Sequence, residues 1–181
     1  MDAVSPGSEF DPDRILMALD RHGVEYVLVG GVAARVHGAQ RATADIDCVP
    51  ATGEENLGRL AAALDELGAR LRVAGMTDDE ARQLPLHLDA TTLAAFGSST
   101  WMTDAGPLDL LVELRDPEGG RHPYGDLATR ATTVLVGNLT IRVASLEDII
   151  ASKEHAARPK DLEALPELRA LREQAGDLPT H

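Results

Sequence analysis

The sequence predicts an α/β (α+β) fold in which helices flank a mixed β-sheet and a helical extension ends the chain. Apolar strands and amphipathic helices follow one another from residue 11 to residue 143, a hairpin signal stands at Gly137-Asn138, and residues 144–181 are largely helical in pattern. At 181 residues, the chain is long enough to bury one proper core. We therefore expect a flexible tail over 1–10, a core over 11–143 and a C-terminal helical extension over 144–181.

The elements follow in order from periodicity and from helix-start and helix-end signals. A helix is expected from Pro12 to about residue 22, ended by Gly23. Strands are expected at 25–29, 44–49, near 70–74, near 99–103, and at 108–113, 132–136 and 139–143. Further helices are expected at 32–37, at 53–67, from Thr77 with Glu80 as a capping box, and twice after Ser145 with a break at Arg158-Pro159. The composition of residues 115–125 is that of a loop, and we expect it to lie over the site.

Residues 29–49 carry the most informative pattern in the chain. Gly30-Gly31 follow an apolar strand, and Asp45 and Asp47 stand on the next one. Alternation places both aspartates on the same face, with Cα atoms about 6.5–7 Å apart. Two adjacent carboxylates resist ionisation unless a cation lies between them. Glycines at a strand-to-helix turn leave backbone N–H groups free for phosphate and allow close approach of a ligand. Together these features predict a divalent metal site acting on a nucleoside triphosphate.

At this point the sequence resembles the nucleotidyltransferase superfamily with the polymerase-β-like palm. The signature of that superfamily is a hydrophobic-Gly-Gly/Ser turn, roughly ten residues, and then Asp-x-Asp. The string RATADID, with Arg41 and Thr43 ahead of the aspartates, looks most like the AbiEii/MenT branch, which comprises bacterial toxins of toxin–antitoxin systems. The resemblance covers residues 24–50 and 144–168, and residues 52–104 carry none of its motifs.

The resemblance also implies further site residues. The palm needs a third carboxylate on a neighbouring strand, for which we expect Asp109 in GPLDLLVEL, with Glu113 in reserve. Asp109 stands among leucines, where a charge needs a partner unless the strand end reaches solvent. The block ASLEDIIASKEHAARPKD is expected to supply Lys153 and Asp161, with Lys160 adjacent. The chain has fifteen arginines and only two lysines, both in this block, as a triphosphate site would favour.

The net charge of −13 and the pI near 4.7 exclude a general nucleic-acid-binding surface. Any RNA acceptor must therefore be contacted locally, and few aromatic residues are present to stack bases. Six cationic side chains could form such a local patch: Arg41, Arg121, Arg158, Lys160, Arg169 and Arg172. The six histidines show no ligand spacing, which argues against zinc.

A reducing, cytoplasmic location is expected. The single Cys48 lies on the Asp-x-Asp strand and cannot form an internal disulfide, so it is expected to be a small core residue. No apolar stretch is long enough to span a membrane, and residues 1–10 lack a signal-peptide pattern.

The resemblance implies a two-metal enzyme. Two Mg²⁺ ions would be held by Asp45, Asp47 and Asp109, with Gly30, Gly31, Arg41 and Lys153 on the triphosphate and Asp161 orienting Lys153 or the acceptor. It further implies a pyrimidine NTP, the 3′ end of tRNA as acceptor and a cognate antitoxin, which can be kinase-like. If the antitoxin is a kinase, Thr43 is the expected phosphorylation site. The alternative is that Thr43 is an ordinary β-branched strand residue whose hydroxyl has no regulatory role.

Two other functions stay open from the sequence. One is antibiotic nucleotidylation of an aminoglycoside or lincosamide, which an acidic surface would favour for a cationic drug. The other is a catalytically silent palm that acts as a binding module or antitoxin, against which the joint presence of all these site residues argues.

Overall fold

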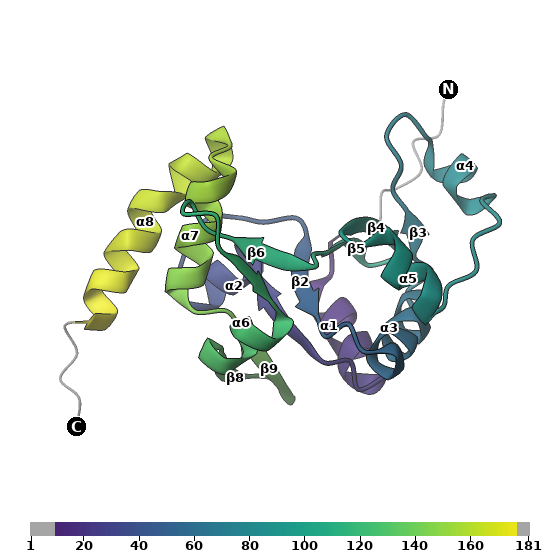
Figure 1. The fold of residues 1–181 in the computed structure, drawn as a ribbon, viewed down its shortest axis with the longest axis horizontal. Helices are drawn as coiled ribbons and strands as arrows, with labels where there is room; N and C mark the ends of the chain where they lie inside the picture. Colours follow the sequence, from purple (N-terminus) through teal and green to yellow (C-terminus); the bar gives the residue numbers. More distant parts are fainter. Residues whose placement is uncertain (1–9, 177–181) are drawn as a thin grey trace.

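A computed structural model of the chain describes residues 10–176 and contains a seven-stranded mixed sheet and a separate two-stranded one (Figure 1). In the larger sheet the strand order is β3-β4-β5-β2-β1-β9-β8. Its strands are β1 (Tyr26–Val29), β2 (Ile46–Pro50), β3 (Arg70–Leu71), β4 (Ser99–Thr103), β5 (Gly106–Leu110), β8 (Thr132–Val136) and β9 (Leu139–Val143). The smaller sheet pairs β6 (Glu113–Arg115) with β7 (Arg121–Pro123). The helices are α1 (Pro12–Arg21), α2 (Gly30–Val36), α3 (Glu54–Glu66), α4 (Asp78–Arg82), α5 (Ala90–Phe96), α6 (Tyr124–Arg130), α7 (Leu146–Ala156) and α8 (Pro159–Gly176).

The centre of the large sheet confirms the predicted α/β class. Strand β2 runs antiparallel to β1 and parallel to β5, while β1 runs parallel to β9. Strands β1 and β2 are almost entirely buried, as strands at the centre of a covered sheet are expected to be. The register pairs Val29 with Asp47, and Asp47 with Asp109. The two strands that carry predicted site carboxylates are therefore direct neighbours.

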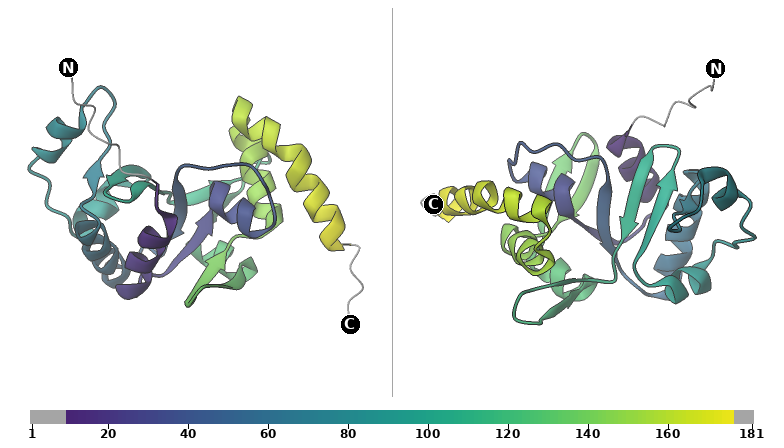
Figure 2. Two further views of the ribbon diagram at one scale, coloured as in Figure 1. Left: turned by 180° about the vertical axis from the view of Figure 1, so that it is seen from behind. Right: turned by 90° about the horizontal axis from the view of Figure 1, so that it is seen from above.

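Helices lie at both ends of the long axis of the molecule. Figures 1 and 2 show α7 and α8 at one end and α4 at the other, with β1 and β2 between them. Helix α7 begins where Ser145 accepts a hydrogen bond from the Asp148 backbone N–H at 3.1 Å, as the sequence predicts. It packs against α8. Across residues 10–176, no helix is both long and apolar enough to cross a bilayer.

The first helix begins as its start signal predicts. The Asp11 side chain accepts from the Arg14 backbone N–H at 3.0 Å, and Pro12 occupies the first turn. Phe10 packs partly buried against the core, next to Gly106. The predicted tail of residues 1–10 therefore does not include Phe10, and residues 1–9 lie outside the described part of the chain.

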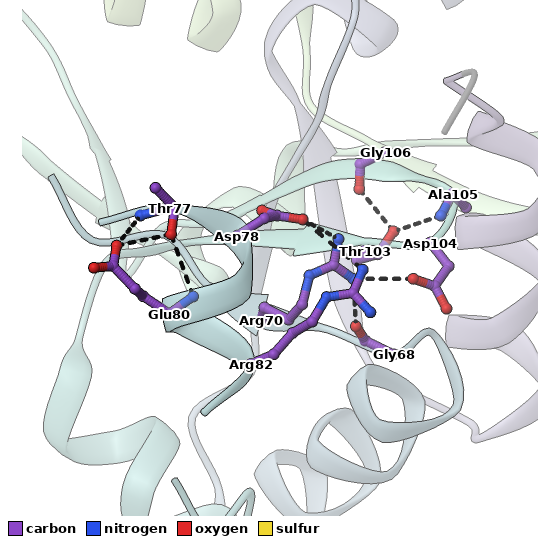
Figure 3. A network of polar contacts seen from close by, with 10 residues as sticks. All are labelled: Gly68, Arg70, Thr77, Asp78, Glu80, Arg82, Thr103, Asp104, Ala105 and Gly106. Atoms are coloured by element: carbon purple, nitrogen blue, oxygen red, sulfur yellow. Dashed lines mark hydrogen bonds and ion pairs between the residues drawn. The ribbon is translucent and has the colours of Figure 1, made fainter. Parts of the chain in front are cut away.

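The segment of α4 is anchored by a single arginine (Figure 3). Arg70 of β3 donates hydrogen bonds to the Asp78 carboxylate at 2.7 Å and to the Asp104 carboxylate at 2.9 Å. Thr77 and Glu80 form the predicted capping box. No residue of α4 is buried. This helix is consequently held by polar contacts and lies far from the centre of the sheet.

Several predicted boundaries were wrong. Residues 115–125 are not a loop but the β6–β7 hairpin and the start of α6, closed where Asp116 accepts from the Gly120 backbone N–H at 2.7 Å. The strand predicted near 70–74 contains only Arg70 and Leu71. The one predicted at 108–113 ends at Leu110, so Glu113 belongs to the small sheet. Helices α5 and α6 were not predicted, because each is short and carries a single buried residue, which leaves no apolar period to detect.

Candidate active site

Three carboxylates converge at the centre of the large sheet. Oxygen atoms of Asp45, Asp47 and Asp109 all lie within 4.8 Å of one another. Asp47 and Asp109 are opposite each other on β2 and β5, and Asp45 immediately precedes β2 rather than lying inside a strand over 44–49 as predicted. One carboxylate oxygen of Asp109, Oδ1, is buried and has no hydrogen-bond partner among the described residues. A buried, unpartnered carboxylate oxygen beside two other carboxylates is the arrangement that a bound cation would satisfy.

The raised pKa of Asp47 also indicates a site for a cation. Burial, and then the neighbouring Asp45 and Asp109 carboxylates, raise the pKa of Asp47 to about 7. The positive charge of Lys160 and a hydrogen bond from the Gly31 backbone N–H act in the opposite direction on that pKa. Without a cation, the three aspartates therefore resist carrying three negative charges together.

Gly30 and Gly31 make room for these side chains. At Gly30, which has φ of +67°, a Cβ would overlap the carboxylate of Asp47. At Gly31, a Cβ would lie 2.6 Å from Oγ1 of Thr43. The predicted short helix at 32–37 begins two residues earlier, at Gly30, so both glycines form the first turn of α2. Their lack of a side chain lets this turn approach the carboxylates closely.

Thr43 directly contacts Asp45, one of the candidate metal ligands. Its hydroxyl donates to Oδ1 of Asp45 at 2.8 Å. The side chain is partly buried and lines the same pocket as the three aspartates. Thr43 thus helps to orient Asp45.

A second cluster joins the two C-terminal helices. Asp161 is 1% exposed and accepts from Nζ of Lys153 at 3.2 Å and from Nε of Arg158 at 2.6 Å. Burial alone would raise the pKa of Asp161, but the hydrogen bonds from Arg158 and Lys153 outweigh it and hold this pKa below its ordinary value. The hydrogen bond to Asp161, with smaller effects from Asp47 and Asp45, raises the pKa of Arg158. Asp161 therefore holds two cations that face the three aspartates.

A pocket of about 400 Å³ contains all of these groups. It brings together every residue that the sequence predicts for catalysis, nucleotide binding or metal: Gly30, Gly31, Arg41, Asp45, Asp47, Asp109, Lys153 and Asp161. Thr43 and Lys160 line it as well. Arg41 also donates to Glu163 of α8 at 2.8 Å, which links the segment before β2 to the C-terminal extension.

Some predictions are not met. Glu113 does not join the three aspartates but accepts from Nε of Arg121 at 2.8 Å, and Arg115 also bonds to it. Of the six cationic side chains that could form a local patch, Arg41, Arg158 and Lys160 line the pocket, and Arg121, Arg169 and Arg172 do not. Arg169 instead bonds to Glu154 at 2.6 Å.

The sequence analysis did not predict that Arg158 pairs with Asp161 in the site. It appeared as a helix interruption and a patch candidate, whereas the structure bonds it to Asp161 and turns its charge toward the aspartates. Its proximity to Pro159, which begins α8, is the signal that could have placed it at the junction of two helices.

A mixed sheet with three clustered carboxylates, a glycine turn and facing cations defines a nucleotidyltransferase of the polymerase-β-like fold. The family profile described as "Nucleotidyl transferase AbiEii toxin, Type IV TA system" matches residues 14–170. The chain belongs to this AbiEii family. A comparison with curated proteins finds no match.

Solved structures share the fold at low sequence identity. The crystal structure of the lincosamide antibiotic adenylyltransferase LnuA with bound lincomycin has a TM-score of 0.54 and 16% identity, covering 90% of this chain and 99% of that one. The complex of ANT(2")-Ia with adenylyl-2"-tobramycin has a TM-score of 0.51 and 19% identity, covering 90% of this chain and 92% of that one. At such identities the likeness concerns the fold alone.

Proposed function

We propose that the chain transfers a nucleoside monophosphate from an NTP to an acceptor hydroxyl with release of pyrophosphate, and that it depends on two Mg²⁺ ions. The observation that carries this proposal is the buried, unpartnered Oδ1 of Asp109 beside Asp45 and Asp47. Oxygen-only ligands of this kind suit Mg²⁺. Bound there, the ions would activate the attacking hydroxyl and neutralise charge on the reacting phosphates.

In this proposal the aspartates and the glycine turn have different roles. Asp45, Asp47 and Asp109 hold the metal ions. Gly30 and Gly31 let the first turn of α2 approach the triphosphate closely, in addition to accommodating Asp47 and Thr43. The pocket volume of about 400 Å³ suits one nucleotide.

Cations on the opposite side of the pocket serve the triphosphate. Lys153 and Arg41 neutralise the charge that develops on the leaving pyrophosphate, with Arg158 and Lys160 beside them. Asp161 fixes the direction of Lys153 through their 3.2 Å hydrogen bond. Because Asp161 is buried and charged, it holds Lys153 in place before the nucleotide arrives.

For the acceptor, we propose the 3′ end of tRNA, with a pyrimidine nucleotide added so that aminoacylation and translation stop. Membership of a toxin family of type IV systems supports this choice over drug modification. The second candidate is an antibiotic. It is favoured by the fold shared with LnuA and ANT(2")-Ia and by the net charge of −13, which suits a cationic drug.

A cognate antitoxin, acting as a kinase on Thr43, is the regulation we propose for this site. A phosphate there would add about −1.5 to −2 charges beside Asp45, whose carboxylate lies 2.8 Å from the hydroxyl. It would also occupy the space facing Gly31. Thr43→Glu should abolish transfer, whereas Thr43→Val, which loses only the hydrogen bond to Asp45, should retain most of it. A phosphate mapped by mass spectrometry to another residue after co-expression with the neighbouring antitoxin would refute this role.

The direct test is to incubate the protein with Mg²⁺, each α-labelled NTP in turn and total tRNA, with Asp47→Ala alongside. The expected result is label on tRNA with the wild type only, from CTP or UTP. Label on an aminoglycoside or lincosamide instead would establish the second candidate. Metal-independent labelling, or equal labelling by Asp47→Ala, would overturn the site assignment.

A further inference from the structure

A second hollow, which we call the side groove, adjoins the nucleotide pocket and has a volume of about 360 Å³. Five residues line both: Leu111, Leu114, Ser152, Ala156 and Arg158. The other residues of the side groove are Ser98, Val112, Glu113, Arg115 and His155. It therefore lies between the β6 strand and the end of α7, and it shares part of its lining with the pocket of the three aspartates.

The chain itself leads from the metal-site aspartates into this groove. Asp109 lines the nucleotide pocket, Leu111 lines both hollows, and Glu113 and Arg115 line the side groove. The Leu111 backbone N–H still bonds to the Cys48 carbonyl at 2.9 Å, so this segment continues beside β2 past the end of β5. A molecule in the side groove that followed this segment past Leu111 would approach Asp109.

The two hollows are similar in volume, about 400 and 360 Å³, but only the first contains the three aspartates. In the proposed function the nucleotide fills that pocket, so the acceptor must enter from elsewhere. In-line transfer requires the acceptor hydroxyl to reach the α-phosphate from the side opposite the leaving pyrophosphate. The side groove adjoins the pocket at Leu111, Leu114 and Ser152 and is the candidate for that entrance.

Near the groove, shielded carboxylates are paired with exposed guanidinium groups. Glu113, Arg115 and Arg158 line the groove itself, whereas Asp161 lines the nucleotide pocket. The Glu113 side chain is 11% exposed and is bonded by Arg115 at 3.0 Å and Arg121 at 2.8 Å, whose side chains are 54% and 67% exposed. Asp161, 1% exposed, is likewise bonded by Arg158, which is 61% exposed. Although the whole chain carries −13, the two well-exposed charged side chains that line this groove are both arginines, Arg115 and Arg158.

We propose that the side groove binds the phosphate backbone of a single-stranded RNA 3′ end, with Arg115 as a phosphate contact that determines acceptor class. This rests on the proposed function and gives the path by which its acceptor reaches Asp109. Exposed arginines at the groove attract a polyanion. They repel a polycationic aminoglycoside, because like charges lower both the rate of encounter and the affinity. The acidic remainder of the surface then confines RNA binding to this one entrance.

The test compares Arg115→Gln and Arg115→Glu with Arg82→Glu, which makes the same charge change on an exposed arginine of α4. Thermal unfolding first establishes that each variant is folded. Steady-state labelling then gives kcat, the KM for tRNA and the KM for NTP. Binding of a fluorescent RNA with an unpaired 3′ end is measured over a range of salt concentrations.

We expect Arg115→Gln to raise the KM for tRNA about 3-fold, because it removes a phosphate contact, and Arg115→Glu about 10-fold or more, because it also adds a repelling charge. The KM for NTP should change less than 2-fold. The slope of log affinity against log salt should fall by about 0.7, the value for one phosphate on a single strand. Arg82→Glu should behave as the wild type.

The outcomes separate the two proposals. If the wild type labels tRNA but both Arg115 variants match Arg82→Glu in KM and salt slope, the side groove is not the RNA path, while the proposed function stands. If the wild type labels an aminoglycoside and no RNA, the RNA path and the tRNA acceptor fail together. Unfolding of Arg115→Glu leaves Arg115→Gln as the deciding variant, because it adds no carboxylate beside Glu113.

Discussion

Asp109 lies directly opposite Asp47, because β5 runs parallel to β2 in the register that pairs these two residues. A slip of one residue between these strands would turn one of the two carboxylates to the other face of the sheet. The buried leucines on either side, Leu108 and Leu110, oppose such a slip because it would bring Asp109 into the core. Core packing thus fixes the geometry of the carboxylate cluster.

Asp109→Asn should lower kcat on the order of 10³-fold, since loss of a metal ligand removes several kcal/mol of transition-state stabilisation. The variant should unfold at or above the wild-type temperature in the absence of metal, because it removes one of three repelling charges. Asp65→Asn on the exposed side of α3 is the matched control and should leave kcat unchanged. Single-turnover labelling with saturating NTP measures the effect, and retention of more than a tenth of the activity would contradict the role of Asp109.

Stability should depend on pH through Asp47, whose pKa is raised from 3.8 to about 7. A folded-state pKa above the unfolded one means that the folded state holds the proton more tightly. The contribution is therefore complete below about pH 4 and is lost as the pH rises through 7. Without metal, we expect the free energy of unfolding to fall by a few kcal/mol between pH 5 and pH 8, at about 1.4 kcal/mol per unit of pKa shift.

Asp47→Asn should flatten this dependence in denaturant titrations at each pH. In the wild type, Mg²⁺ should raise the unfolding temperature more at pH 8 than at pH 6, because the ion competes with the proton. A wild-type stability that rises between pH 6 and pH 8 without metal would contradict the raised pKa of Asp47.

Asp161→Asn should lower both stability and turnover. The buried carboxylate accepts from Lys153 and Arg158, and hydrogen bonds to charged groups are worth about 1.5–3 kcal/mol each. We expect a loss of about 2–4 kcal/mol and a kcat reduced 10- to 100-fold because Lys153 is no longer held in place. Glu154→Gln breaks the more exposed pair with Arg169 between the same helices and should cost less than about 1 kcal/mol. Equal effects of the two substitutions would rule out a special role for Asp161.

Gly30→Ala should inactivate the enzyme through geometry rather than through instability. Gly30 and Gly23 both have positive φ, +67° and +66°, but a Cβ at Gly23 meets nothing within 4 Å, whereas at Gly30 it overlaps Asp47. Both substitutions carry a backbone cost of about 1–2 kcal/mol. Only Gly30→Ala should also displace Asp47 and reduce kcat, by about 100-fold or more. Equal kcat values for the two variants, measured well below their unfolding temperatures, would show that Asp47 tolerates the added methyl group.

Local patterns predicted the parts of this protein that depend on neighbours in the sequence. Asp11-Pro12 and Ser145 begin helices as predicted because caps are satisfied within three residues. The β8–β9 hairpin has its predicted bounds because a tight turn fixes its own register. The β6–β7 hairpin was missed because its closing contacts, Asp116 with Gly120 and with His122, join polar residues in a segment without apolar alternation.

By itself, the sequence determined most of the candidate site residues, since the glycine turn, Asp-x-Asp and the two lysines each carry a recognisable chemical pattern. Only the tertiary structure decided that Asp109 and not Glu113 joins Asp45 and Asp47, and that Arg158 shares Asp161 with Lys153. The reason is that strand register and helix docking result from the burial of many side chains at once. Such contacts join residues far apart in the chain, as between Arg41 and Glu163, which are 122 positions apart, and no local pattern encodes them.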